Sequence, residues 1–292
     1  MSSLPAQVSD WQSRGTKKRI FGRDVFVFDS GGPNEETLVI LHGFPTSSFD
    51  FHRVMPHFTK RFRVVIHDHP GFGLSDKPRD YSYSLFEQAE VAMEIWRGLG
   101  IHKAHLLAHD YGTSVATEVL ARRERGSCPI DLQSVTLANG SVFIELAHLT
   151  PSQIALRNKT LGPVFARLSS KVVFQAQLRK IFGTPDAVSK DELDAAWALL
   201  VHADGKLVLP AISSYLDERT RFKERWIGAL AKLDIPAHIL WGRRDPVAVP
   251  AIAEALADTI PRVHLTWLDE LGHYPMLEDP TRWAENVLKF YK

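Results

Sequence analysis

Apolar runs and amphipathic stretches alternate along the first half of the chain. Short continuous apolar runs, typical of strands covered on both faces of a parallel sheet, occupy residues 37–41, 63–66, 104–107 and 132–137. Between them, residues 84–99 and 113–125 have the pattern of helices. The alternation predicts an α/β protein with a mostly parallel sheet and helices on both of its faces.

The amino-terminal segment follows a different pattern. Strand-like pieces at residues 19–21 and 25–28 surround Gly22 and predict a hairpin. We expect residues 1–16, ahead of this hairpin, to form a loose arm. The stretch from Met1 to Arg14 is polar and lacks the apolar core of a signal peptide, which favours a cytoplasmic protein.

A third pattern begins after residue 140. From about residue 141 to 223 no strong strand run occurs, and helical stretches dominate, at 151–161, 164–182, 190–202 and 209–226. Strand and helix then alternate again, at 237–241, 251–260, 263–268 and 280–292. Because no low-complexity linker intervenes, we interpret residues 141–227 as a helical cap, or lid, inserted into one α/β core made of residues 1–140 and 228–292.

Composition excludes several classes of partner. The 292 residues carry a net charge of +1, so nothing indicates a nucleic-acid partner. No apolar run approaches the roughly 20 residues that span a bilayer, so we expect no membrane span. The single cysteine, Cys128, excludes an internal disulfide and fits a reducing compartment.

The segment Ala108-His109-Asp110-Tyr111-Gly112 joins a buried strand to a helix. A sharp strand-to-helix turn with small residues around a central reactive residue has the form of a nucleophile elbow. Bulky neighbours would collide across so tight a turn, which explains Ala108 and Gly112. The usual occupant of the centre is Ser, but here it is Asp110.

Two further residues lie where predicted strands end. Asp245 follows Trp241-Gly242-Arg243-Arg244, and His273 follows Leu271-Gly272. The chain order of Asp110, Asp245 and His273 is nucleophile, acid, histidine, and all three would meet at the carboxyl edge of a parallel sheet. Asp245 alone could be a helix cap and His273 alone a loop residue, but together they predict a catalytic triad.

The carboxylate of Asp110 changes the chemistry that the triad can perform. A carboxylate is anionic at pH 7 and needs no base to activate it. Its attack on an ester would give an anhydride, whereas attack on a saturated carbon with a leaving oxygen or halide gives a stable alkyl ester. His273 could then activate water, with the backbone N–H groups of Phe44 and Tyr111 as the oxyanion hole. The alternative is an elbow without catalytic function.

At this point the chain resembles a known family. The segments His42-Gly43-Phe44-Pro45, 68–78, 109–112, the Asp245 turn and Gly272-His273-Tyr274-Pro275 are similar to the α/β-hydrolase superfamily, in its epoxide hydrolase and haloalkane dehalogenase branch. Within it, residues 44–50, 84–89, 109–112 and 225–230 resemble the group of the mesoderm-specific transcript protein and its bacterial relatives. The resemblance implies an α/β-hydrolase fold, with a mostly parallel eight-stranded sheet and a helical lid inserted after strand 6.

The resemblance also implies site residues and a substrate class. Haloalkane dehalogenases commonly hold the halide with side-chain N–H donors at the positions of Phe44 and Tyr111, and neither residue supplies one. We therefore expect a small apolar epoxide, with dehalogenation or ligand binding without catalysis as alternatives. Tyr215 matches one of the two lid tyrosines that donate a proton to the epoxide oxygen, and residues 172–182 contain no counterpart of the other. The remaining substrate-binding candidates are His42, Pro45, His109 and Tyr274.

Other patterns predict no further chemistry. The spacing of His67, His69 and His109 fits no usual metal site, and the glycine-rich residues 71–75 lack the lysine of a phosphate loop, so we expect neither metal nor cofactor. The charged residues between Arg219 and Arg225 are expected to form a solvated helix face. We expect a monomer or a homodimer.

Overall fold

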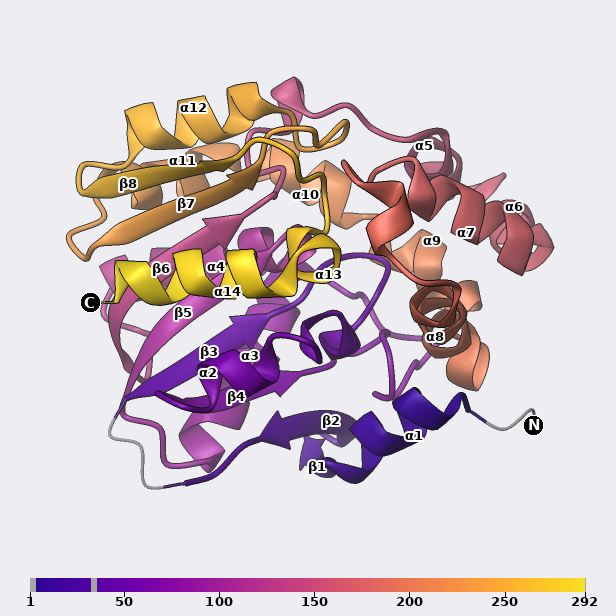
Figure 1. Cartoon of the computed structure of the whole chain (residues 1–292), viewed down its shortest axis with the longest axis horizontal. Coiled ribbons are helices and arrows are strands. Elements are labelled where there is room, and N and C mark those ends of the chain that lie inside the picture. Colours follow the sequence, from indigo (N-terminus) through magenta and orange to yellow (C-terminus); the bar gives the residue numbers. More distant parts are fainter. Residues whose placement is uncertain (1–3, 33–35, 292) are drawn as a thin grey trace.

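Eight strands form one sheet in the order β1-β2-β4-β3-β5-β6-β7-β8 (Figure 1). The computed structural model describes residues 4–32 and 36–291. The strands are β1 Gly15–Ile20, β2 Arg23–Asp29, β3 Thr37–Leu41, β4 Arg63–His67, β5 Lys103–His109, β6 Asp131–Ala138, β7 Ala237–Gly242 and β8 Val263–Leu268. The pairs β1–β2 and β2–β4 are antiparallel and the others are parallel, so the predicted mostly parallel eight-stranded sheet is confirmed.

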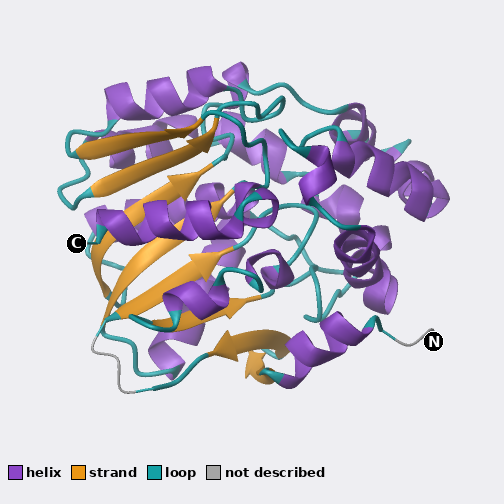
Figure 2. Ribbon diagram, in the orientation of Figure 1, coloured by secondary structure: helices purple, strands orange, loops and turns teal. Residues whose placement is uncertain are grey.

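Helices cover both faces of this sheet (Figure 2). On one face lie α3 Leu85–Gly98, α4 Tyr111–Glu124, α11 Lys223–Ala231 and α12 Pro250–Thr259, and on the other lie α1 Ala6–Ser13, α2 Met55–Phe58, α13 Pro275–Glu278 and α14 Pro280–Phe290. The burial of β3 on both faces of the sheet explains why its sequence is an unbroken apolar run. Val39 and Leu41 pack into one core while Leu38 and Ile40 pack into the other, because successive strand residues point to opposite faces.

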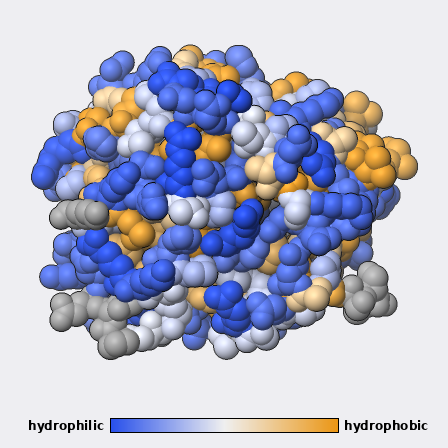
Figure 3. Space-filling view, viewed as in Figure 1, coloured by the Kyte–Doolittle hydropathy of each residue, from blue (hydrophilic) through white to orange (hydrophobic). Residues whose placement is uncertain are grey.

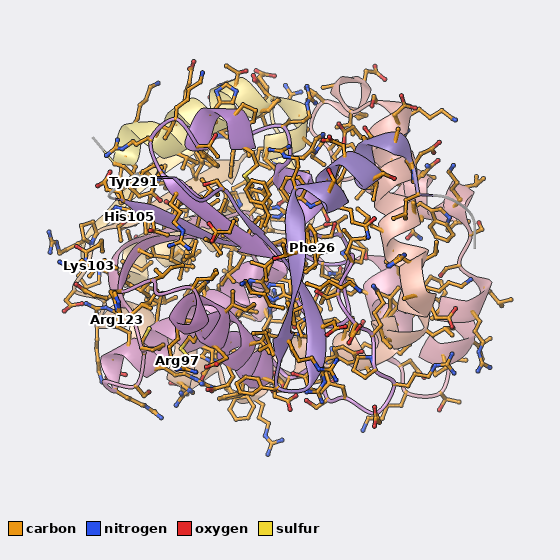
Figure 4. The ribbon with its side chains drawn as sticks, turned by 90° about the horizontal axis from the view of Figure 1, so that it is seen from below. Phe26, Arg97, Lys103, His105, Arg123 and Tyr291 are labelled. Carbon is orange, nitrogen blue, oxygen red and sulfur yellow. The ribbon has the colours of Figure 1, made fainter. Side chains whose placement is uncertain are left out.

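Helix α14 returns the chain to the edge of the sheet opposite the predicted site. In Figure 4, Tyr291 lies beside His105, and the two ring centroids are 4.7 Å apart. His105 lies near the start of β5, so the carboxyl terminus contacts the amino-terminal half of that strand. The loops that carry Asp110, Asp245 and His273 follow the carboxyl ends of β5, β7 and β8, at the opposite edge.

The expectation of a loose arm at residues 1–16 is wrong for its described part, residues 4–16. This segment contains helix α1 and the start of β1. Trp11 is buried and stacks on Phe28 with ring centroids 4.9 Å apart, and its indole N–H donates to Ser48 Oγ at 3.2 Å. Burial of this large ring stabilises a helix too short to persist alone. Residues 1–3 lie outside the described part of the chain.

The segment between β6 and β7 is mostly helical and contains no strand among its described residues. It ends with α11, which covers the sheet; its other α-helices, called here the inserted helices, are α5 Pro151–Arg157, α6 Gly162–Leu168, α7 Lys171–Arg179, α8 Lys190–Val201, α9 Leu209–Ile212 and α10 Tyr215–Arg221. They lie beyond the arrowheads of the parallel strands, at the right of Figure 1. The division of the chain at residues 140 and 227 stays a prediction.

Two of the helices expected in this segment are divided in the structure. Residues 164–182 form α6 and α7, separated at Ser169 and Ser170, where the Ser170 hydroxyl accepts from the backbone N–H of Val173 and begins α7. Residues 209–226 are divided among α9, α10 and α11. The apolar spacing continues through these breaks, so periodicity alone could not locate them.

The stretch 190–221 is, by length and composition alone, apolar enough to cross a bilayer. In the structure it is divided into α8, a 3-10 segment, α9 and α10, and Ala203 and Asp204 have positive φ angles of 48° and 61° within the 3-10 segment. Our expectation that the chain has no membrane span stays a prediction.

The charge run from Arg219 to Arg225 is only partly solvated, which corrects the expectation of a solvated helix face. Arg219 is buried, donates through Nε to Ser114 Oγ at 2.7 Å and lies over the ring of Tyr215 at 4.5 Å. Arg225 donates twice to the carboxylate of Glu118, at 2.7 and 2.9 Å. Through these hydrogen bonds, Arg219 on α10 and Arg225 on α11 connect their helices to α4.

Candidate active site

Asp110 lies at the turn between β5 and α4, with φ of 45° and ψ of −112°. This conformation is uncommon for a residue with a side chain and lifts the carboxylate above the edge of the sheet. Thr113 stabilises the turn, donating to the Asp110 carbonyl through N–H at 3.0 Å and through Oγ1 at 2.6 Å. At Gly112 a β-carbon would collide with the carbonyl oxygen of Leu41, so this position requires glycine.

The structure brings the three predicted triad residues together. His273 Nδ1 lies 2.6 Å from Asp245 Oδ2, a hydrogen bond in which the ring donates. His273 Nε2 lies 3.6 Å from Asp110 Oδ1, an ion-pair distance that leaves the Asp110 carboxylate free of a direct hydrogen bond from the ring. All three residues are at most 3% exposed, so little water screens their charges.

Asp245 is fixed by hydrogen bonds to both carboxylate oxygens. Its Oδ1 accepts from the backbone N–H groups of Val247 and Ala248, at 2.8 and 2.9 Å. Its Oδ2 accepts from the Asn139 side-chain amide at 2.8 Å as well as from His273. Asp245 therefore shapes a turn and orients His273 at once. Asn139, at the end of β6, was missed in the sequence analysis, although its place at a strand end was visible there.

The environment of His273 determines its protonation. Burial alone would lower the pKa of its imidazole. The charge and hydrogen bond of Asp245, together with the charge of Asp110, outweigh burial and raise the pKa to about 9. At pH 7 the ring is therefore an imidazolium between two carboxylates.

Of the two predicted oxyanion-hole donors, the structure places one in contact with the Asp110 carboxylate. The backbone N–H of Phe44 donates to Asp110 Oδ2 at 2.8 Å. The structure gives no hydrogen bond between the backbone N–H of Tyr111 and the Asp110 carboxylate in the described part of the chain. Tyr111 begins α4, so its N–H is one of the helix-end donors that have no partner within the helix.

Three of the substrate-binding candidates make hydrogen bonds to backbone groups of the loops that carry the site. His42 donates from Nδ1 to the Gly43 carbonyl at 2.8 Å and accepts from His69 N–H at Nε2, which fixes a neutral ring whose pKa burial lowers. His109 bonds through Nε2 to the backbone carbonyl of His273 at 2.7 Å. Tyr274 donates to the Phe44 carbonyl at 3.2 Å. These contacts hold the Phe44 and His273 loops in place.

A cavity of about 100 Å³ opens above the triad. Asp110 and His273 lie in its wall together with Phe44, Pro45 and Val247. Residues between 150 and 209 supply the rest of the wall, and the wall is mostly apolar. Of the five substrate-binding candidates, Pro45 is the one that lines this cavity. The polar side chains of its wall that the sequence analysis missed are Thr150, Ser152, Gln153, Ser169 and Gln177, and the indole of Trp197 also lines it.

Tyr215 lies just behind the cavity wall. It is buried, its ring packs against Tyr111 and Phe44 with centroids 5.0 and 5.6 Å away, and its hydroxyl accepts from Gln153 Nε2 at 3.2 Å. Burial raises the pKa of its hydroxyl to about 12, against the opposing charge of Arg219, and the charge of Asp110 adds to the rise. Gln153 thus separates the phenol from the cavity.

The buried histidines below the site are not arranged as a metal centre. Among residues 4–32 and 36–291, no group of three or more His, Cys, Asp or Glu side chains could hold a metal ion. Burial lowers the pKa of His67 to about 3 and that of His69 well below its usual value, so both rings are neutral. His69 packs against His42 at 4.5 Å between centroids, as support for the loop.

Sequence comparison places these features in a family. The family described as the α/β hydrolase fold matches residues 36–280. Over 281 residues the chain is 42% identical to the putative hydrolase LipZ of Mycobacterium tuberculosis, an overlap of 96% of each chain. It is 39% identical over 296 residues to the mesoderm-specific transcript homolog protein of Homo sapiens, covering 98% of this chain and 88% of that one.

Solved structures agree on the fold. The epoxide hydrolase CorEH superposes with a TM-score of 0.77 at 20% identity, over 95% of this chain and 98% of that one. The haloalkane dehalogenase DbeA from Bradyrhizobium elkani superposes with a TM-score of 0.78 at 22% identity, over 94% and 96%. The resemblance drawn from the motifs is confirmed, including its likeness to the mesoderm-specific transcript group. The chain belongs to the α/β-hydrolase fold family.

Proposed function

We propose that this hydrolase-family protein is an epoxide hydrolase that works through an alkyl ester on Asp110. The observation that carries the proposal is the placement of Asp110 and His273 together in the wall of one cavity, with Asp245 hydrogen-bonded to the far side of the imidazole. The largely apolar wall favours a small apolar organic substrate.

In the first step the carboxylate of Asp110 attacks a ring carbon of the epoxide. The new bond joins Asp110 Oδ1 or Oδ2 to that carbon, and the carbon–oxygen bond of the three-membered ring breaks. The Phe44 N–H already donates to Oδ2, so the other oxygen, which faces His273 at 3.6 Å, is the better nucleophile. The leaving oxygen must gain a proton as the ring opens.

Tyr215 is the proposed donor of that proton. A pKa of about 12 keeps the phenol protonated at pH 7, and because its oxygen accepts from Gln153, its own O–H is free to donate. Gln153 lines the cavity and Tyr215 does not, so donation follows a movement of the Gln153 side chain. The phenolate is then neutralised by the proton that His273 carries at rest.

The second step uses the neutral imidazole that the first step leaves. Esterification removes the charge of Asp110, one of the charges that raise the pKa of His273, so the ring stays neutral more readily and is available to accept a proton. His273 takes a proton from water, and the resulting hydroxide attacks the carbonyl carbon of Asp110. The oxyanion forms beside the Phe44 N–H. Collapse breaks the bond between the Asp110 carbonyl carbon and the substrate oxygen, and that oxygen takes the hydroxyl proton of the intermediate. The diol leaves, and the carboxylate and the imidazolium are restored.

Single-turnover reaction in heavy-oxygen water tests the ester. With enzyme in excess over styrene oxide, the label should enter the Asp110 carboxylate and the first product should carry unlabelled oxygen. His273→Gln should trap the ester, visible as a mass increase on the peptide that contains Asp110. Label that goes directly into the first product contradicts the proposal.

A substrate panel separates the epoxide from the other functions. Aliphatic and styrene-like epoxides should be hydrolysed, and haloalkanes should release little halide, because Phe44 and Tyr111 offer no side-chain N–H to the leaving ion. Halide release that Asp110→Asn abolishes, without epoxide turnover, would assign dehalogenation. Tight ligand binding that Asp110→Asn leaves unchanged, with no turnover, would assign a binding protein.

A further inference from the structure

The outer side of α5, α6 and α7 exposes large apolar side chains. Seven large hydrophobic residues are exposed in the described part of the chain, and six of them lie here: Ile154, Leu161, Val164, Leu168, Val172 and Val173. Leu168 and Val172 are 78% and 77% exposed. In Figure 3 the apolar surface at the right edge lies over α6. We call these six residues, with the helices that carry them, the α5–α7 face.

The charged residues within the stretch of chain that forms this face are all cations. Residues 151–182 contain six cations and no acidic residue: Arg157, Lys159, Arg167, Lys171, Arg179 and Lys180. Arg157 is paired with Asp217 and Lys171 with Asp194. No ion pair to the other four cations is found within the described residues, and Lys206 adds its ammonium group beside the Arg167 carbonyl at 2.8 Å.

We propose that the α5–α7 face docks on an anionic lipid bilayer. Exposed Leu and Val side chains beside unpaired Lys and Arg are the composition of helices that lie in the membrane interface, where apolar groups enter the headgroup boundary and cations meet anionic lipids. A second copy of the chain fits less well. A two-fold interface would bring the same cations together, and like charges repel.

The docked face would deliver substrate to the cavity. Leu156, Phe165 and Val173 come from α5, α6 and α7, and all three line the cavity above Asp110. Val173 is also 48% exposed, so it lies at the border between the cavity and the outer face. An apolar substrate dissolved in the bilayer would enter here without crossing water. Docking does not depend on the chemistry of Asp110, whereas substrate delivery rests on the proposed function.

Vesicle co-sedimentation tests the docking. The full chain should bind vesicles of mixed phosphatidylcholine and phosphatidylserine, and bind pure phosphatidylcholine more weakly. The double variant Leu168→Ser, Val172→Ser removes the two most exposed side chains of the face, neither of which lines the cavity. It should lose most of the binding. Phe21→Ser, at an exposed apolar residue in the β1–β2 turn, is the matched control and should bind as the wild type does.

The cations form a second arm of the test. Lys159→Gln and Arg167→Gln should each weaken binding to the mixed vesicles about fivefold, because one cation near an anionic surface contributes about 1 kcal/mol. They should leave binding to pure phosphatidylcholine unchanged. Asp110→Asn should bind like the wild type, which keeps this test separate from the test of the ester.

Three results would overturn the proposal. The first is a wild-type chain that stays in solution with both kinds of vesicle. The second is binding that Leu168→Ser, Val172→Ser leaves unchanged while circular dichroism shows a native fold. The third is a concentration-dependent dimer that the same variant dissociates, without vesicle binding, since that would assign the face to a second copy.

Discussion

The carboxyl edge of the sheet and the inserted helices form opposite walls of one cavity, but they are built differently. At the sheet edge, Asp110, Asp245 and His273 are buried and every carboxylate oxygen of Asp245 has hydrogen-bond partners. The inserted helices range from 4 to 12 residues, and their outer side leaves apolar residues such as Leu168 in contact with solvent. One wall is fixed by the main core, whereas the other is a thin layer of short helices.

This difference separates chemistry from recognition. Groups that the proposed reaction holds in a fixed geometry lie on loops of the sheet, and the strands that precede Asp110 and Asp245, β5 and β7, are largely buried. In the proposed function, groups that would contact the rest of the substrate lie on the inserted helices, and thin layers of short helices open at lower free energy than a core. Changes at the sheet edge should therefore alter kcat, and changes in the inserted helices should alter KM and access.

Asp110→Asn should have the largest effect. The amide is not a nucleophile, so epoxide turnover should fall by about 10⁴-fold or more, while the fold survives because Asn has the same shape. Steady-state kinetics with thermal unfolding as the control measures this. A residual rate within tenfold of the wild type would place the nucleophile elsewhere and break the assignment of chemistry to the sheet edge.

The sheet wall could largely be predicted from the sequence. The elbow around Asp110 and the loops of Asp245 and His273 are short motifs at the ends of apolar strands, and the topology of a parallel sheet brings such ends to one edge. The alternation of strand and helix predicts that the sheet is mostly parallel, but it does not predict the order of the strands. The motifs did not predict the supporting hydrogen bonds, such as those from Asn139 to Asp245 and from His109 to the His273 carbonyl. These contacts join residues that are far apart in the chain.

The inserted wall could be predicted only as helical. The break between α6 and α7 depends on a serine cap that periodicity does not detect, and the cavity-facing positions of Gln153 and Trp197 depend on how short helices pack. Helix α1 was missed for the same reason, since burial of Trp11 against Phe28 is a tertiary contact. Where stability comes from distant partners, a local pattern carries little information.

Glu118→Gln should cause the largest loss of stability. Glu118 lies buried on α4 and accepts from Arg122, Arg225 and the Trp226 indole. Burial would raise the pKa of its carboxyl, but these hydrogen bonds hold the pKa below its usual value. Removing the charge should cost about 3 kcal/mol, since the two arginines lose their shared anion. Denaturant unfolding measures this loss in the free energy of unfolding, with the exposed Glu224→Gln as the matched control. An equal loss in both variants would contradict a stabilising role for the buried charge of Glu118.

The ionisation of His273 should make stability fall at high pH. Its pKa rises from about 6.5 to about 9 on folding, so its stabilising contribution is complete below pH 6.5 and is lost as pH rises through 9. The shift corresponds to about 3 kcal/mol. The difference in unfolding free energy between wild type and His273→Gln should therefore shrink between pH 6 and pH 10. A difference that stays constant would show that the ring is neutral at rest.

Tyr215→Phe tests whether the inserted wall takes part in chemistry. Loss of a positioned proton donor should lower kcat about 10²-fold, with a smaller change in KM. Tyr274→Phe is the matched control on the sheet wall, since its hydroxyl donates to the Phe44 carbonyl and supports the loop. The control should change stability by about 1 kcal/mol and kcat little. Equal kcat for Tyr215→Phe and wild type would restrict the chemistry to the sheet.

Thr150→Ala should have the smallest effect and sharpens the comparison most. Thr150 and Gln153 form a reciprocal cap at the start of α5, and Gln153 also reaches the Tyr215 hydroxyl. Loss of the cap should cost about 1 kcal/mol locally, without touching the triad. Because α5 contributes to the cavity wall, KM should rise severalfold while the trapping of the ester by His273→Gln stays intact. If kcat fell in proportion instead, the two walls would act as one rigid unit, and the separation of chemistry from recognition would not hold.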